Sequence, residues 1–186
     1  MNLETYKKYF RPSMENHKSK TNPQICKACG GDCCHSMGCH IAPEDLMSLT
    51  SSDIISFIDE SGCISIDWWE GNPVTEEHDD KRYYFLRIRN KSANIIDPSY
   101  GGECSILTDT GCVLPFEYRP KGARELIPCI DNCEQRYTKQ QCAIDWMPYN
   151  DILEEVYNHY ADIEGEPDMF SNAIDGMLGL LGMLGL

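Results

Sequence analysis

Apolar residues recur at helical spacing in several stretches, each bounded by residues that begin or end helices. Four of the residues 54–58 are apolar, Ser52-Asp53 before them suits a helix cap, and Gly62 suits the end of the same helix. Pro43 fits the first position of another helix, followed by two acids at the positive end of its dipole. We also expect a short helix near the start, a helix from Pro128, and then a longer helix with core contacts Ile144, Trp146, Ile152, Val156 and Tyr160.

A period of two residues marks the strands. Residues 82–89 give the clearest strand, aromatic and alternating, while residues 63–69 alternate more weakly and residues 71–80 read as a polar loop. Turn residues at 101–102 and 109–111 make Cys104–Cys112 a predicted hairpin with a cysteine at each foot. The fold class expected is α+β: a small single domain with several helices around a short antiparallel sheet.

The composition supports one domain with terminal additions. With 186 residues, 41% of them hydrophobic, the chain can bury a core of its own. We divide it into a helical and polar extension at 1–25, a cysteine-rich domain at 26–165 and an apolar, glycine-studded tail at 166–186. The tail is shorter than the ~20 apolar residues that span a bilayer, so no transmembrane segment is expected. It is either a disordered or packed end, or an amphipathic segment that docks on a protein partner or a membrane surface.

Charge and the start of the chain narrow the partners and the compartment. The formal net charge of −14 repels a phosphate backbone, so no nucleic-acid partner is expected. The first ten residues contain no continuous apolar run of the kind that directs export, which favours a cytoplasmic location. The oligomeric state is left open.

Cysteine is the residue type that carries the candidate chemistry. The chain has 11 cysteines, an odd number that a complete set of disulfides cannot use, and clustered thiols in a reducing compartment are more often metal ligands. Several of them fall at spacings that bring sulfurs together, such as Cys-x-x-Cys and i, i+4. The candidate ligands of zinc or of an iron–sulfur cluster are Cys26, Cys29, Cys33, Cys34, Cys39, Cys104, Cys112, Cys129, Cys133 and Cys142.

The adjacent pair Cys33-Cys34 bears on the number of sites. Neighbouring side chains point in different directions, so the pair favours two nearby metal positions, or one cluster with a second thiol beside it. Cys39 and Cys142 are each a ligand or a structural thiol, whereas Cys63 lies among apolar residues and is expected to be a buried small hydrophobe. The flanking histidines, His35 and His40, fit hydrogen-bonding or surface roles better than ligation. Glu103 and Asp109 are candidates for acid–base work or for contacts to the hairpin cysteines, and otherwise solvated turn residues.

The cysteine run and the segments that follow it resemble the YkgJ-type cysteine-cluster family, a zinc- or iron-chelating domain named for a CxxCxxCC motif. The similarity covers roughly residues 26–150 and departs from the motif in having three residues between Cys29 and Cys33. The family often has a further cysteine where this chain has Ala123, so Cys129 or Cys133 would have to supply that ligand. The matching segments are Cys26, Cys29, Cys33 and Cys34, then IAPEDL at 41–46, the hairpin at 103–112, and RPKGAR at 119–124.

The resemblance implies metal binding and leaves the biological role open. The first hypothesis is a protein module whose bound zinc or iron–sulfur cluster organises the domain. The second is an iron–sulfur enzyme with redox or protein-modifying activity, by analogy with flagellin lysine N-methylases, which look like larger proteins containing such a cysteine cluster. The third is metal storage or sensing. No catalytic residue is assigned, and no glycine-rich fingerprint of a nucleotide cofactor is present.

Overall fold

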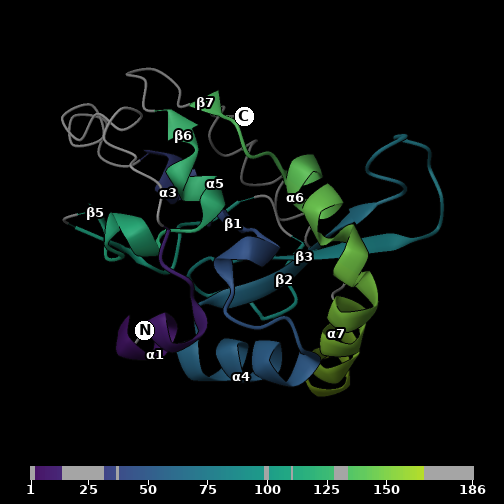
Figure 1. The fold of residues 1–186 in the computed structure, drawn as a ribbon, viewed down its shortest axis with the longest axis horizontal. Coiled ribbons are helices and arrows are strands. Elements are labelled where there is room, and N and C mark those ends of the chain that lie inside the picture. The colour runs from purple at the N-terminus through teal and green to yellow at the C-terminus, as the bar shows by residue number, and fades with distance from the viewer. Residues whose placement is uncertain are drawn as a thin grey trace, which may run out of the picture.

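A three-stranded antiparallel sheet lies at the centre of the fold, with helices packed around it (Figure 1). The structure is a computed structural model that describes residues 3–13, 32–36, 38–98, 101–109, 111–127 and 134–165. The strand order is β1-β3-β2, with β1 at His40–Ile41, β2 at Ile64–Glu70 and β3 at Arg82–Ile88. The expected α+β class is therefore confirmed.

The two long strands pair along their whole length. Ile64 lies opposite Ile88 and Glu70 opposite Arg82, which confirms both predicted strands and the polar loop between them. Trp68, Tyr84 and Phe85 are buried, whereas Trp69 and Tyr83 are only half-buried. Most positions of both strands are buried on either face, as is usual for a sheet that is covered on both sides.

Helix α4, Ser51–Ser61, forms where the apolar pattern predicted it and buries Ile54, Phe57 and Ile58. Its N-cap is Thr50 rather than Ser52-Asp53: the Thr50 hydroxyl accepts the Asp53 N–H at 3.3 Å. Gly62 ends the helix with a φ of +62°, which confirms its predicted role, since residues with a Cβ rarely adopt this conformation.

The first helix, α1 at Leu3–Tyr9, confirms the expected helix near the start and belongs to the same core. The Tyr6 ring stacks on Phe10 with centroids 4.7 Å apart and meets Phe57 edge-on at 5.5 Å. Phe10 then forms an antiparallel bridge with Leu46. The chain is therefore anchored in the core well before its cysteine-rich part begins.

The long helix expected near the end is two helices. α6 covers Lys139–Trp146, a 3₁₀ turn η4 follows at Met147–Tyr149, and α7 covers Asn150–Glu164. Pro148 falls in the 3₁₀ turn, and a residue without a backbone N–H cannot continue the hydrogen-bond ladder of an α-helix. Of the five predicted core contacts, Trp146, Val156 and Tyr160 are buried and Ile144 and Ile152 are half-buried.

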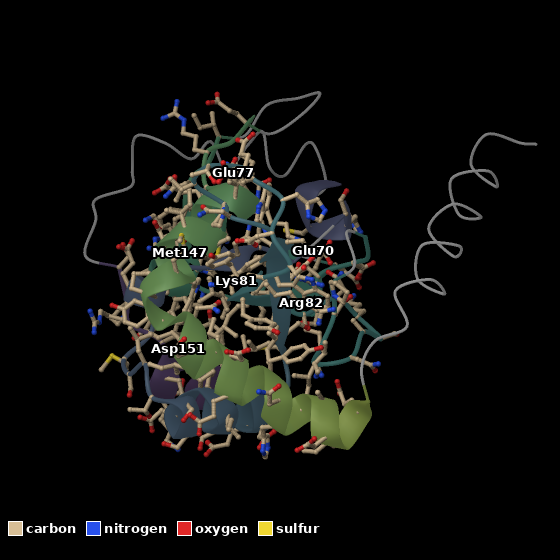
Figure 2. All side chains as sticks on the ribbon, turned by 90° about the vertical axis from the view of Figure 1, so that its right-hand side faces the viewer. Glu70, Glu77, Lys81, Arg82, Met147 and Asp151 are labelled. Carbon is tan, nitrogen blue, oxygen red and sulfur yellow. The ribbon has the colours of Figure 1, made fainter. Side chains whose placement is uncertain are left out.

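Helix α7 covers one end of the sheet. The Arg82 guanidinium donates to the Tyr157 hydroxyl at 3.1 Å, and the Tyr84 N–H donates to the Asn150 side chain at 2.9 Å. Figure 2 shows Arg82 and its strand partner Glu70 on this face, beside the helix. At its other end, α7 reaches α4, where the Tyr160 hydroxyl donates to the Ile55 carbonyl at 3.2 Å.

Short elements complete the described part of the chain. The helix expected at Pro43 is a single 3₁₀ turn, η2, at Pro43–Asp45. The predicted helix from Pro128 lies outside the described residues, between the paired strands β6 and β7. The remaining elements are α3 at Asp32–Ser36, β4 at Leu107–Thr108, β5 at Gly111–Cys112, η3 at Phe116–Tyr118, α5 at Lys121–Arg124, β6 at Leu126–Ile127 and β7 at Glu134–Gln135.

The tail at 166–186 also lies outside the described residues, so its two interpretations stay predictions. Within the ranges that the structure describes, no helix combines the length and the apolar character needed to cross a membrane.

A network of buried charges joins the sheet to the elements around it. The Arg87 side chain is fully buried and forms ion pairs with Asp67, at 3.2 Å, and with Asp97. Asp67 also pairs with Lys139 of α6 at 3.0 Å. Two positive and two negative groups therefore balance each other in an environment where a single unpaired charge would be strongly destabilising.

We predict that Arg87→Met lowers the free energy of unfolding by about 3–5 kcal/mol, because it leaves the buried Asp97 carboxylate without its charged partner. Urea denaturation at pH 7 measures the effect. The matched control is Arg136→Met, which removes the exposed pair with Glu134 (3.2 Å) and should cost less than about 1 kcal/mol. Equal effects of the two substitutions would contradict the importance assigned to the buried network.

Candidate metal centre

Six of the 11 cysteines have described side chains, and no disulfide joins any two of them: Cys34, Cys39, Cys63, Cys104, Cys112 and Cys142. The predicted ligands Cys26, Cys29, Cys129 and Cys133 lie outside the described residues, as does the side chain of Cys33. The described thiols are therefore only part of the predicted ligand set.

The end of β3 holds the backbones of three of these cysteines. The Ile88 N–H donates to the Cys39 carbonyl at 2.9 Å, and the Arg89 N–H donates to the Cys63 carbonyl at 2.7 Å. Cys39 immediately precedes β1 and Cys63 immediately precedes β2, so these two cysteines flank the end of the strand that lies between β1 and β2. Cys104 joins them through a bridge to Asn90.

The hairpin confirms the predicted turn but corrects the position of one cysteine. Leu107, not Cys104, lies opposite Cys112 in the strand register, although the two thiols are near enough for Cys112 to raise the pKa of Cys104. Cys104 instead pairs with Asn90, because the Ser105 N–H donates to the Arg89 carbonyl (2.9 Å) and continues the end of β3. The hairpin still carries Cys112 to the same region. We call Cys39, Cys63, Cys104 and Cys112 the thiol cluster.

Helix α3 is attached directly to this cluster. The Cys104 N–H donates to the Cys34 carbonyl at 2.7 Å, and the Gly102 N–H donates to the Ser36 carbonyl at 3.0 Å. The Asn90 side chain holds the two segments that meet here. It accepts the Gly38 N–H at 2.9 Å and donates to the Gly101 carbonyl at 3.0 Å. Asn90 did not stand out in the sequence, because a single asparagine after a strand reads as an ordinary turn residue.

Burial controls the ionisation of the cluster. It raises the pKa of Cys104 to about 11 and the pKa of Cys39 and Cys63 above the ordinary thiol value. Nearby thiols add to the effect: Cys104 and Cys112 both raise the pKa of Cys39. Without a cation, Cys39, Cys63 and Cys104 therefore stay protonated at neutral pH.

Cys142 has a different setting. It lies on α6, fully buried, and its thiol donates to the Ile41 carbonyl at 3.4 Å, while the Trp146 indole N–H donates to the same oxygen at 2.8 Å. Burial raises the pKa of the Cys142 thiol as well. Of the two interpretations left open for this residue, its contacts favour the structural thiol.

The two histidines also differ. His35 is exposed and lies 3.4 Å from Glu103, which also pairs with Lys91. His40 is buried, with its Nδ1 atom 3.4 Å from the Gln135 amide nitrogen. Burial, with Arg87 and Lys139 nearby, lowers the pKa of His40 to about 4, so its ring is neutral at pH 7. Asp109 is exposed on its turn.

Two segments that are distant in the sequence meet at Asp45, which is buried. Its carboxylate accepts the N–H groups of Ala42 and Lys121 and the Arg124 guanidinium, each at 2.9 Å. Helix α5 is thereby held against β1, so closely that a Cβ at Gly122 would lie 2.8 Å from the His40 carbonyl oxygen. IAPEDL and RPKGAR together fix the strand that Cys39 precedes, a contact that the sequence did not predict.

The described residues contain no group of three or more His, Cys, Asp or Glu side chains arranged to hold a metal ion. The four thiols of the thiol cluster therefore do not form a metal site among themselves. No protein-family model, no curated protein and no solved structure matches the chain.

The raised pKa values predict how the stability of the metal-free protein depends on pH. Above pH 9 the unfolded chain loses the thiol protons of Cys39, Cys63 and Cys104 while the folded chain holds them more tightly, so stability must fall as the pH rises toward 11. For Cys104 alone the loss amounts to about 2 kcal/mol. Urea denaturation of the reduced protein between pH 7 and 11 should show a shallower decline in Cys104→Ser, since serine does not titrate there. Parallel declines in the two proteins would contradict the assignment.

Proposed function

We propose that this protein binds a metal, as a zinc ion or an iron–sulfur cluster, through its clustered cysteines. The observation that supports the proposal best is that Cys39 and Cys104, from separate parts of the chain, are both held at the end of β3, and that Cys104 and Cys112 are near enough to raise the pKa of the Cys39 thiol. Both kinds of centre need several thiolates within a small volume.

The thiols suit a metal better than they suit a polar network. A buried thiol is a weak hydrogen-bond donor, and a group of them contributes little beyond packing. Cation binding would displace the protons that burial otherwise holds on Cys39 and Cys104, and the resulting thiolates would be neutralised by the metal. The backbones of Cys39 and Cys104 are themselves held by hydrogen bonds to Ile88 and to the Cys34 carbonyl.

The remaining ligands would come from the Cys26–Cys33 run and from Cys129 and Cys133. The described part of the chain supports the first of these, because α3 carries Cys34 and the Cys34 carbonyl binds the N–H of Cys104. A metal shared between this run and the thiol cluster would tie the start of the cysteine-rich domain to the end of the sheet. We leave Cys142 out of the proposed centre, since its thiol is bonded to the edge strand.

We further propose membership of the YkgJ-type cysteine-cluster family. Support comes from the contact between two of the segments that carry the resemblance, the one ending at Leu46 and the one starting at Arg119. They are 76 residues apart at the Asp45–Lys121 hydrogen bond, yet they share a buried carboxylate next to the strand that follows Cys39. The contact gives these two segments a common structural role, because together they hold the strand that follows Cys39.

Anaerobic purification followed by metal analysis and a visible spectrum tests the proposed function. We expect either stoichiometric zinc in a colourless protein, or iron and sulfide with an absorption band at about 400 nm. A protein that holds neither metal after anaerobic handling would contradict metal binding.

Serine substitutions test the assignment of the site. Cys104→Ser and Cys26→Ser should each lower the metal content by more than half, because each removes a thiolate from the proposed centre. Cys142→Ser is the matched control: it exchanges a buried thiol for a hydroxyl that can donate to the same Ile41 carbonyl, and its metal content should stay at the wild-type level. Loss of metal from the control alone would show that the centre lies elsewhere.

A further inference from the structure

A groove with a volume of about 190 Å³ lies between α1, α4 and the residues that follow η2. Leu46, Ile54 and Phe57 form an apolar, almost completely buried floor, and Met47, which also lines the groove, is 57% exposed. The antiparallel bridge between Phe10 and Leu46 joins the α1 side to the η2 side. An exposed methionine beside an apolar floor gains free energy when another apolar group covers it.

The size and the chemistry of the groove favour an apolar side chain of a peptide over a free small molecule. Sites for small molecules usually measure about 300–1,000 Å³, well above the volume of this groove. The polar side chains at its rim already have partners. Lys8 donates to Glu60 at 3.2 Å, and the Asp53 carboxylate accepts the Ser48 hydroxyl at 2.5 Å. The groove therefore offers apolar contact more than it offers hydrogen bonds.

The tail at 166–186 contains a segment with matching chemistry. Every residue from 177 to 186 is Met, Leu or Gly, and seven of these ten residues are Met or Leu. A contiguous apolar surface of this kind is rarely left in contact with water. We call residues 177–186 the Met-Leu-Gly segment.

The position of α7 brings the tail within reach of the groove. The Tyr160 hydroxyl donates to the carbonyl of Ile55, the neighbour of Ile54 in the floor, and α7 ends about one turn later, at Glu164. Figure 1 shows α4 with α7 on one side and α1 on the other. Residues 166–176 can span about 35 Å when extended. A helix with its side chains is only about 10–12 Å across, so the Met-Leu-Gly segment can pass α4.

We propose that the Met-Leu-Gly segment docks in this groove of its own chain, with Met and Leu side chains against the apolar floor and over Met47. Such docking is independent of the proposed metal binding. A weak intrinsic affinity is enough, because a short tether corresponds to an effective concentration in the millimolar range. The glycine at every third position from 176 to 185 lets the backbone approach the floor closely. The docked segment holds α1 against α4 from outside.

Photo-cross-linking of the full chain tests the docking. Met47→p-benzoylphenylalanine places a photoreactive group at the groove, at a position exposed enough to accept the larger side chain. After irradiation, peptide mass spectrometry should find position 47 linked to residues 177–186. Isotope-labelled and unlabelled protein are mixed in equal amounts beforehand. Docking within one chain joins only peptides that carry the same label, whereas docking of a second copy also joins labelled to unlabelled peptides.

The same chain with Leu180→Asp and Leu181→Asp added tests the role of the apolar side chains. We expect the yield of the link from position 47 to fall about tenfold, because a carboxylate cannot enter an apolar groove without losing its hydration. An unchanged yield would contradict docking through these side chains.

Val74→p-benzoylphenylalanine is the matched control. Val74 is 60% exposed, close to the value for Met47, but it lies between β2 and β3 next to Pro73, whose carbonyl accepts the Gln140 side chain of α6 at 2.8 Å. It should give no link to residues 177–186. No link from position 47, equal links from both positions, or links that join differently labelled peptides would each overturn docking within one chain. None of these results depends on metal content, so they leave the proposed function standing.

Discussion

The buried guanidinium of Arg87 is the interaction on which most of this fold depends. It joins β3 to β2 through Asp67 and to the segment beyond β3 through Asp97, and Asp67 extends the contact to Lys139 of α6. The residues directly after Arg87 then hold the backbones of Cys39 and Cys63. The same part of the chain that neutralises the buried charges therefore also positions the cysteine backbones, so the stability of the core and the geometry of the candidate centre are linked through three consecutive residues, 87–89.

The buried carboxylate of Asp45 has a comparable role at the edge of the sheet. Strand β1 is only two residues long, too short to be held by its own ladder, and it needs support from outside. Asp45 supplies it by joining the turn after β1 to α5. Charged residues are rarely buried unless they are paired, and two of the three buried carboxylates in the described part of the chain, Asp45 and Asp67, each fix an element next to the thiols.

Much of the fold could be predicted from the sequence because the signals were local. Apolar periodicity and Gly62 gave α4, and aromatic alternation gave β3. The errors arose where one residue overrode a pattern: Pro148 divides an otherwise helical stretch, and Cys104 pairs with Asn90 instead of with its hairpin partner. The cysteines could be named as ligands from spacing alone. Asn90 could not, since what distinguishes it is the pair of backbone groups, at Gly38 and Gly101, that its side chain bonds across the fold.

The glycine before Cys39 sets a limit on how this region can vary. A Cβ at Gly38 would lie 1.9 Å from the carbonyl oxygen of Ile88, a separation that no adjustment of a side chain can relieve, because the obstacle is backbone. Even alanine would separate Cys39 from the end of β3. A thiol can be exchanged for another donor while the chain keeps its path, but residue 38 has no such substitute. During divergence, this position would therefore be expected to change more slowly than the ligands themselves.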